Sequence, residues 1–211
     1  MVKQERAALT RRSLVQAAAE VFAREGFVTS ALTSISRKAG VSNGALHFHF
    51  ESKQALAAAV EEEAAAVVGA ITRAGPAGGG PVQQLIDATH VLMERLEHDV
   101  VLRAGFELAT GAPRREHAAD LRGLWQHWVE QVLAQAEREG ALAAGVSAAD
   151  AALTVVAATV GFEQLAGADR SWLSADTLVR FWDLVLPRLA APGVLGRLLS
   201  GGTHRAAPTP L

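Results

Sequence analysis

The chain has 211 residues, of which half are hydrophobic and a fifth are charged, and it contains no cysteine. A chain of this length buries one large core or two small ones. The lack of cysteine excludes disulfides, thiol catalysis and cysteine-ligated metal centres, and it fits the reducing cytoplasm, where we expect the protein to be located. The first residues, MVKQERAALTRR, lack the apolar stretch of a secretion signal. There is also no uncharged apolar run of about 18 residues, so we expect no membrane span.

The charge is distributed unevenly along the chain. Residues 1–53 hold eight Lys and Arg against four Glu, a net +4, whereas the whole chain sums to −2, so the remainder carries −6. A basic front and an acidic rear indicate that only the front faces a polyanion such as a nucleic acid. From charge alone, it is equally plausible that the basic residues simply form a solvated surface that binds no polyanion.

Abundant alanine and leucine, with few β-branched runs, favour helices throughout. Apolar residues at helical spacing predict a first helix that ends at Gly26 and a helix–turn–helix over 33–50. Ser52 is predicted to cap a helix that runs to about Arg73, and the stretch AGPAGGGP (74–81) marks a boundary. Further helices are expected at 82–97, 99–111, 118–140, 147–166 and 174–190, with Ser147 and Asp150 forming a capping box.

The fold class is therefore all-α, with about nine to ten helices. We expect a helix-turn-helix DNA-binding domain over 1–52 and a ligand-binding and dimerisation domain over 53–191. The glycine- and proline-rich residues 192–211 are expected to form a disordered tail.

The stretch AGVSNGALHFHFESK, residues 39–53, suits a helix-turn-helix. Gly40 permits a left-handed backbone in the turn, and Ser42 can cap the second helix. Small residues at 44 and 45 allow that helix to enter the major groove. Its exposed side would carry polar groups for base edges and phosphates, and Lys53 would hold a phosphate at the start of the next helix. The predicted DNA-binding residues are Thr33, Arg37, Ser42, Asn43, Gly44, Ala45, His47, His49 and Lys53.

Residues 26–56, GFVTSALTSISRKAGVSNGALHFHFESKQAL, resemble the signature of TetR-family transcriptional repressors. That signature has a glycine–aromatic pair, an A-G-V-S/T turn, a G-x-L/I-Y-x-H-F recognition helix and a closing S/N-K-x-x-L. His47 stands where the family usually has tyrosine, and Asn43 where close relatives often have lysine, so the operator sequence does not transfer. Val100 to Gly105, the following LATG and the tryptophan-bearing helix beyond resemble the γ-butyrolactone receptors and pseudo-receptors of actinomycetes.

The resemblance implies a repressor that controls secondary-metabolite genes, such as those for antibiotics, and is released by a small lactone- or furan-like molecule. A pseudo-receptor that answers to another metabolite, or to none, is the alternative. Butyrolactone receptors carry a pocket tryptophan on the equivalent helix, which aligns with Trp125, although Trp125 also lies on an apolar stripe that suits a core. Trp128 is the alternative if the register differs by a turn. The candidate lining residues are His90, Met93, Phe106, Trp125, Trp128, Val160, Phe162 and Gln164.

The helix over 147–166 is apolar on almost every side, so it must be covered by its own fold or by another subunit. We expect the helices at 147–166 and 174–190 to pair with their copies in a four-helix bundle of a homodimer. A two-fold dimer requires a near-palindromic operator with half-sites about 34 Å apart, or a simple multiple of that distance.

Other chemistry is poorly supported by the residues. His47 and His49 are two apart, about 200° on a helix, so they do not readily share a metal ion. Phe48 and Phe50 are expected in the core rather than in contact with DNA. The triple glycine at 78–80 lacks the Lys-Ser/Thr of a phosphate loop, and no serine lies in a nucleophile elbow. We therefore expect neither an enzyme nor a cofactor.

Overall fold

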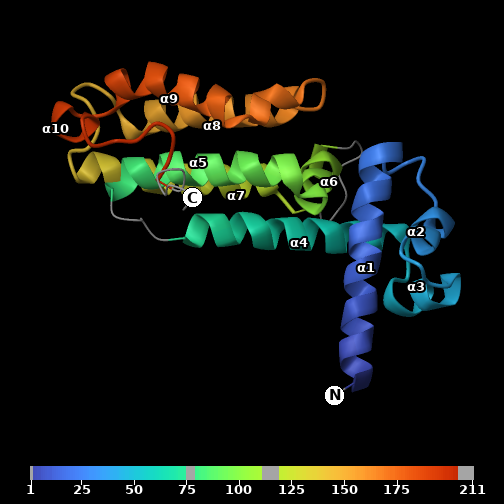
Figure 1. The fold of residues 1–211 in the computed structure, drawn as a ribbon. Coiled ribbons are helices and arrows are strands. Elements are labelled where there is room, and N and C mark those ends of the chain that lie inside the picture. The colour runs from blue at the N-terminus through green and yellow to red at the C-terminus, as the bar shows by residue number, and fades with distance from the viewer. Residues whose placement is uncertain (1, 75–78, 111–118, 204–211) are drawn as a thin grey trace, which may run out of the picture. The chain divides into compact units, whose positions relative to one another are not determined.

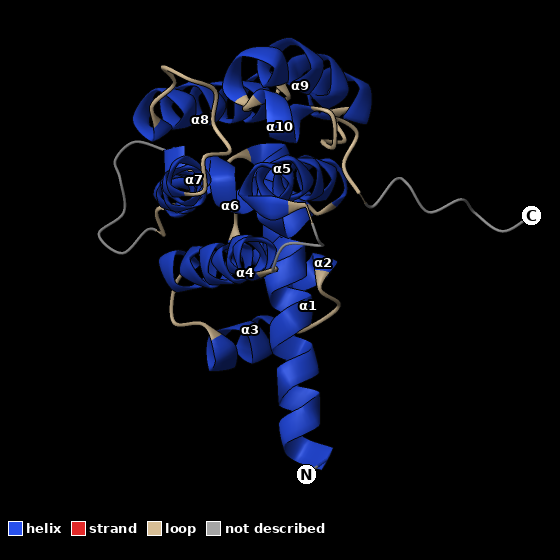
Figure 2. Cartoon of the chain, turned by 90° about the vertical axis from the view of Figure 1, so that its left-hand side faces the viewer, coloured by secondary structure: helices blue, strands red, loops and turns tan. Residues whose placement is uncertain are grey.

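The computed structural model describes residues 2–74, 79–110 and 119–203. Within these ranges all regular structure is helical, apart from one isolated bridge between Leu142 and Ala190, which confirms the all-α prediction (Figures 1 and 2). The helices are α1 (Val2–Glu25), α2 (Leu32–Lys38), α3 (Asn43–His49), α4 (Lys53–Arg73), α5 (Gly80–His98), α6 (Val100–Thr110), α7 (Leu121–Arg138), α8 (Ala148–Leu165), the 3-10 helix η1 (Arg170–Leu173), α9 (Ala175–Leu189) and α10 (Pro192–Leu195). No described helix has the length and apolar character needed to cross a membrane.

The chain forms two compact units. The first runs to Val67 and resumes over Asp99–Leu121, so it holds α1 to α3, most of α4, and α6. The second comprises Val68–His98 and the chain from Arg122 onward. The sequence predicts a DNA-binding domain that ends at residue 52 and a ligand-binding domain that begins at residue 53. That boundary separates functions and differs from the boundaries of the packed units, and it stays a prediction.

The core of the first unit lies between α1, the first half of α4, α6 and the two short helices α2 and α3. Leu14, Ile35 and Leu46 are fully buried there, one from each of α1, α2 and α3. Gly26 ends α1 as predicted, because its φ of 78° lies in the left-handed region and its N–H donates to the Phe22 carbonyl oxygen at 2.8 Å.

The second unit is built from α5, α7, α8 and α9. Trp125 on α7 and Trp182 on α9 are its largest fully buried side chains. The predicted cap of α8 is confirmed, since the Ser147 hydroxyl oxygen accepts from the Asp150 N–H at 3.1 Å and its proton goes to the Asp150 carboxylate at 2.6 Å.

The predicted tail from residue 192 is wrong for its first part. Residues 192–195 form α10, and the segment that follows is held against α5 by hydrogen bonds. Gln83 accepts from the Leu199 N–H at 2.8 Å, and Asp87 accepts from the Thr203 N–H at 2.8 Å. The glycine-rich composition suggested disorder, but the buried polar side chains of α5 supply partners for the backbone of this segment. Residues 204–211 lie outside the described part of the chain.

Candidate nucleic-acid interface and ligand pocket

A tight turn sets the angle between α2 and α3. Gly40 has a φ of 69°, and the Val41 N–H donates back to the Ser36 carbonyl oxygen at 3.0 Å. Ser42 caps α3, its hydroxyl oxygen accepting from the Ala45 N–H at 3.1 Å, which confirms the predicted cap. Ile35 and Leu46 are buried between the helices. One face of α3 is thereby anchored in the core and the opposite face is left in solvent.

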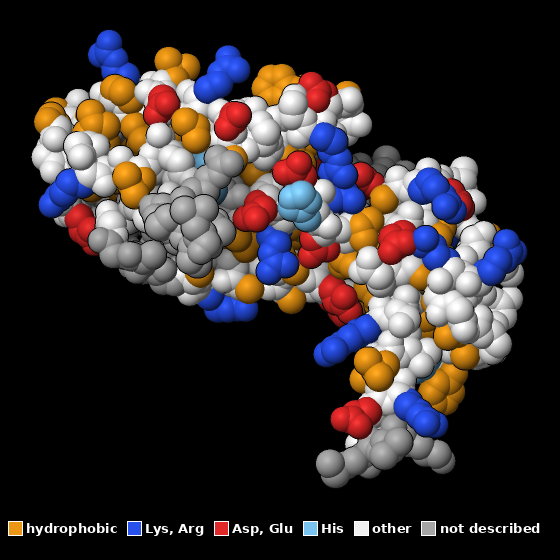
Figure 3. All heavy atoms as spheres, in the orientation of Figure 1, with side chains coloured by type: hydrophobic (Ala, Val, Ile, Leu, Met, Phe, Trp, Pro, Cys, Tyr) orange, Lys and Arg blue, Asp and Glu red, His pale blue; other side chains and the backbone are white. Residues whose placement is uncertain are grey.

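Most of the predicted DNA-binding residues lie on the exposed surface of α2 and α3. Figure 3 shows several Lys and Arg side chains on the surface around α1 and α2. His49 and Ala45 are half-buried, because they stand at the edge of the exposed face of α3. The exposed members of the predicted set are Thr33, Arg37, Ser42, Asn43, Gly44 and His47.

Asn43 is oriented by a contact within the motif. Ser36 donates its hydroxyl proton to the Asn43 amide oxygen at 2.8 Å. The amide oxygen is therefore engaged with the protein, and the NH₂ group is the part of Asn43 that remains to donate to an acceptor on DNA. Purine N7 atoms and phosphate oxygens are such acceptors.

Lys53 has a different environment from the one predicted. Its ammonium group donates to the carbonyl oxygens of Phe27, Val28 and Ser30 at 2.7, 3.0 and 2.9 Å. An ammonium has three protons, so all its donors are engaged with the loop between α1 and α2. It also lies over the Phe27 ring, 4.8 Å from the centroid. The structure thus gives Lys53 a structural role, and its phosphate contact stays a prediction.

A second cation near the motif is also paired. Lys38 contacts the Glu20 carboxylate at 2.6 Å, joining the end of α2 to α1. Hydrogen bonds from Lys38 and Gln16 lower the pKa of Glu20 below its ordinary value. Both side chains are partly exposed, so the ion pair contributes little to the free energy of folding. Its main effect is to fix the position of the end of α2 against α1.

The two phenylalanines of the stretch 39–53 have opposite environments. Phe50 is buried, 4 % exposed, with the Arg11 guanidinium 5.3 Å from its ring centroid, as predicted for a core residue. Phe48 is 82 % exposed, so its expected place in the core is wrong. Residues four apart share a helix face, so Leu46 and Phe50 both point to the core, whereas Phe48 lies on the other side.

The eight residues proposed to line a ligand pocket have different surroundings in the described part of the chain, and their meeting in one pocket stays a prediction. Phe106 belongs to the first compact unit, and the others belong to the second. Phe162 packs on Trp172 and Phe181, with ring centroids 6.1 and 5.5 Å away. Gln164 is exposed on α8 and bonds to Glu163, and Met93 is buried in α5.

Trp125 is part of a buried polar contact between α7 and α8. It is 2 % exposed, and its indole N–H donates to the Thr159 hydroxyl oxygen at 2.9 Å. The Thr159 hydroxyl in turn donates to the Val155 carbonyl oxygen at 2.9 Å. Trp128 packs against Trp125, with ring centroids 5.1 Å apart. The sequence reasoning missed Thr159, although a threonine in an otherwise apolar helix was a signal that it needs a buried partner.

An ion pair lies close to this contact along both helices. The Arg122 guanidinium donates through two nitrogens to one Glu163 oxygen, at 3.0 and 2.7 Å. Both side chains are mostly buried, 21 % and 11 % exposed. Arg122 is three residues from Trp125 on α7, and Glu163 is four residues from Thr159 on α8. The mostly apolar interface between α7 and α8 therefore contains two polar interactions, the Trp125–Thr159 hydrogen bond and the Arg122–Glu163 ion pair. The apolar stripes alone gave no sign of this pair.

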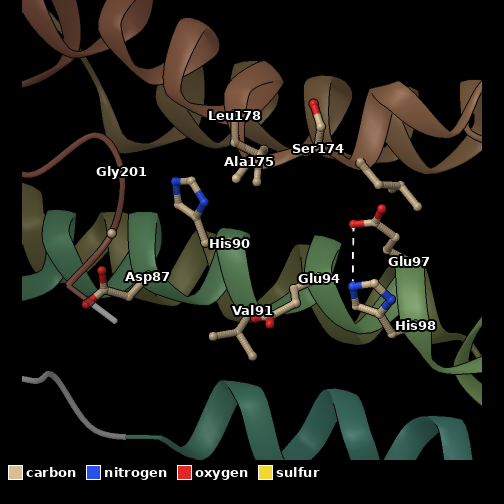
Figure 4. A pocket seen from close by; sticks show the side chains of 12 residues that line it. Asp87, His90, Val91, Glu94, Glu97, His98, Ser174, Ala175, Leu178 and Gly201 are labelled. Carbon is tan, nitrogen blue, oxygen red and sulfur yellow. Dashed lines mark ion pairs between the residues drawn. The ribbon is translucent and has the colours of Figure 1, made fainter. Parts of the chain in front are cut away.

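His90 lines a separate cavity of about 400 Å³ between α5, the start of α9 and residues 201–202. Figure 4 shows its imidazole lying toward Ala175 and Leu178, with Asp87 near Gly201. The ring nitrogen Nε2 is 2.8 Å from the Ser200 carbonyl oxygen. Val160 lines another cavity, an apolar groove of about 660 Å³ on α7 and α8. Neither of these two cavities is lined by Trp125.

Comparison with known proteins agrees with this arrangement. The family described as bacterial regulatory proteins, tetR family, matches residues 14–60, which contain the helix-turn-helix. The A-factor receptor protein of Streptomyces griseus is 31 % identical over 212 residues, covering 96 % of this chain and 71 % of that protein. These similarities are to regulators rather than to enzymes.

Solved structures extend the similarity to the whole chain. A γ-butyrolactone receptor described as ArpA-like superposes with a TM-score of 0.75 at 26 % identity, covering 91 % of this chain and 93 % of that one. The TetR-family protein CprB of Streptomyces coelicolor superposes with a TM-score of 0.81 at 27 % identity, covering 97 % and 100 %. CprB has also been solved with its biological operator sequence, at a TM-score of 0.75, 25 % identity and coverage of 91 % and 94 %. The chain therefore belongs to the tetR family of bacterial regulatory proteins, as a DNA-binding regulator that resembles the γ-butyrolactone receptors.

Proposed function

We propose that the protein is a repressor that binds a near-palindromic operator as a homodimer and is released from it by a small lactone- or furan-like molecule. The observation that carries the DNA-binding part is the exposed face of α3, which the Ser42 cap and the Gly40 turn hold away from the core. Its amide, imidazole and backbone groups suit base edges and phosphates. CprB, which has been solved with an operator, matches nearly the whole chain.

The dimer is supported by apolar surface that a single copy leaves open. Leu153 on α8 and Leu184 on α9 are 71 % and 79 % exposed. The groove on α7 and α8 is lined by small and apolar side chains, including Ala149, Ala152 and Val156. A second copy of the chain would cover these residues through the four-helix bundle expected for 147–166 and 174–190.

The effector is supported by the contact between α7 and α8 and by the relatives that are named receptors of A-factor and of γ-butyrolactone. The Trp125 indole and the Thr159 hydroxyl offer a flat apolar surface beside polar atoms, a combination that suits an oxygen-bearing ring. A ligand that fits only a conformation with badly spaced recognition helices lowers DNA affinity by its differential binding energy. About 3 kcal/mol weakens a complex more than a hundredfold, which suffices for induction.

The test begins with selection of a duplex from genomic fragments by the purified protein. We expect a near-palindromic site whose affinity falls by orders of magnitude between about 50 and 200 mM salt. Synthetic butyrolactones and furans are then titrated into the complex, and release is followed by fluorescence anisotropy. Binding of DNA without response to any of these compounds would remove the proposed effector class and keep the DNA-binding function.

The geometry of Trp125 also favours a second candidate, a pseudo-receptor type regulator that answers to another metabolite or to none. Its indole is buried and its N–H already has a partner in Thr159. Trp125→Phe removes the donor and keeps an aromatic ring with a smaller loss of volume than alanine, whereas Trp125→Ala would cost about 3–5 kcal/mol of stability and obscure the result. If lactones release the wild type and Trp125→Phe shifts their dose response, the receptor assignment holds. If neither protein responds, the pseudo-receptor assignment holds.

A further inference from the structure

Phe48 is the most exposed large hydrophobic side chain in the described part of the chain, at 82 %. The ring contact recorded for it is to its neighbour His49, edge to face with centroids 5.2 Å apart. Single exposed apolar residues are common on protein surfaces. This one lies on α3, however, and the exposed positions beside it include the predicted DNA-binding residues Asn43 and His47.

A small open space, called here the notch at Gly44, lies beside the Phe48 ring. Gly44 lies one turn before Phe48 on the same face of α3. Gly44 is exposed, and a Cβ atom built on it would meet only the Ser42 hydroxyl oxygen, at 3.8 Å. The lack of a side chain at 44 therefore leaves an open space one methyl group deep against the backbone of α3, beside an apolar ring.

The chemistry of the ring restricts what it can recognise on DNA. A phenylalanine has no donor or acceptor, so it cannot bond to a phosphate oxygen or to the polar atoms of a base edge. In the major groove the bases present one apolar group, the 5-methyl group of thymine. A methyl group of this size matches the space beside Phe48.

We propose that Phe48 and the notch at Gly44 form a binding site for the 5-methyl group of one thymine in each operator half-site. The inference rests on the proposed function, because it requires α3 to lie in the major groove. It makes Phe48 a specificity-determining residue: it discriminates thymine from the other bases at one position, while the polar residues of α3 hold the helix in place.

The experiment replaces each thymine of the selected operator, one at a time, with deoxyuridine, which has the same polar atoms and lacks only the methyl group. Dissociation constants of the full-length protein are measured at constant salt. Burial of one methyl group is worth about a factor of four in affinity, so one thymine in each half-site should show a loss of that size.

Phe48→Ala supplies the second half of the test. Because the ring is in solvent, we expect the variant to keep the thermal midpoint of the wild type. It should bind the thymine and deoxyuridine duplexes equally at the contacted position, and keep the wild-type response at all other positions. Phe48→Leu, which retains an apolar side chain, should keep part of the discrimination.

Two outcomes would overturn the inference alone. One is an operator complex in which no single deoxyuridine weakens binding. The other is a Phe48→Ala variant that loses affinity by the same factor on both duplexes, as expected if the ring packs on a sugar of the backbone. A protein that selects no duplex at all would overturn the proposed function together with this inference.

Discussion

Gly105 on α6 approaches Ala64 on α4 so closely that a Cβ atom on Gly105 would lie within 3.0 Å of the Ala64 Cβ, a separation that real Cβ atoms essentially never show. The same atom would lie 3.3 Å from a methyl group of Leu121. The Ala64 Cβ is attached directly to the helix backbone, so it cannot rotate away. The two helices therefore pack at this distance because residue 105 has no side chain.

Gly105→Ala should lower the stability of the protein. Alanine favours a helix by about 0.8–1.0 kcal/mol over glycine, but overpacking of this kind costs about 1–3 kcal/mol. Each kcal/mol of net loss lowers the thermal midpoint of a chain of this size by about 2–4 °C, which calorimetry can measure. Gly161→Ala on α8 is the matched control, because a Cβ there meets nothing within 4 Å. Equal midpoints for the two variants would contradict the close packing.

Lys53→Met tests whether Lys53 is a structural residue or a phosphate ligand. The three carbonyl oxygens of the loop after α1 lose their donor, so we expect the free energy of unfolding to fall by about 1–3 kcal/mol. The dependence of operator affinity on salt should keep its wild-type slope, since the ammonium already has three partners in the protein. The measurements are a denaturant titration and a salt series of binding constants.

Arg37→Met is the control for that experiment. Arg37 is exposed on α2 and is one of the predicted DNA-binding residues, with a guanidinium that suits a phosphate. We expect its removal to leave stability unchanged and to reduce the slope of log affinity against log salt by about 0.9 for each phosphate that the guanidinium no longer neutralises. A Lys53→Met variant that behaves like Arg37→Met, with full stability and a reduced slope, would restore the phosphate contact predicted from the sequence.

The helix order, the turn at Gly40 and the caps at Ser42, Ser52 and Ser147 could all be predicted, because each depends on residues within a few positions of one another. The environment of Phe48 was also within reach of the sequence. Leu46 and Phe50 are four apart and share a buried face, so residue 48 had to lie on the other side.

Other features depend on contacts that the sequence does not reveal. Trp125 bonds to Thr159, 34 positions away, and Gln83 bonds to the backbone of Leu199, 116 positions away. A stripe of apolar residues shows that a helix is packed, but it does not show which helix covers it or which polar group meets which. For this reason each proposed pocket residue is plausible from its own helix, whereas their meeting in one cavity stays a prediction.

Asp87→Ala should loosen the segment after α10. The Asp87 side chain is 8 % exposed, and it accepts from both the N–H and the hydroxyl of Thr203, at 2.8 and 2.7 Å. A hydrogen bond to a charged group is worth about 1.5–3 kcal/mol, so amide exchange at Thr203 should become roughly 10- to 100-fold faster. Hydrogen exchange read by NMR or mass spectrometry can follow it.

Glu94→Ala is the comparison for the Asp87 variant, since Glu94 is an exposed carboxylate on the same helix. Its removal should leave exchange after α10 at the wild-type rate. If Asp87→Ala also leaves that rate unchanged, the segment is held by the other contacts to α5, those of Gln83 and His90, and the carboxylate is dispensable.

Leu153→Glu tests the proposed dimer. Leu153 is 71 % exposed at the edge of the apolar groove on α7 and α8, where a second copy would cover it. A carboxylate buried there without a partner costs several kcal/mol, and a two-fold dimer places two of them at one interface, so the dissociation constant of the dimer should rise more than a hundredfold. Leu9→Glu, at a 60 % exposed position on α1, should remain dimeric. Sedimentation velocity distinguishes these outcomes, and a Leu153→Glu protein that stays dimeric would move the interface away from α8. Operator binding should weaken with the dimer in the Leu153 variant, because a single recognition helix binds a half-site too weakly once the second subunit has dissociated.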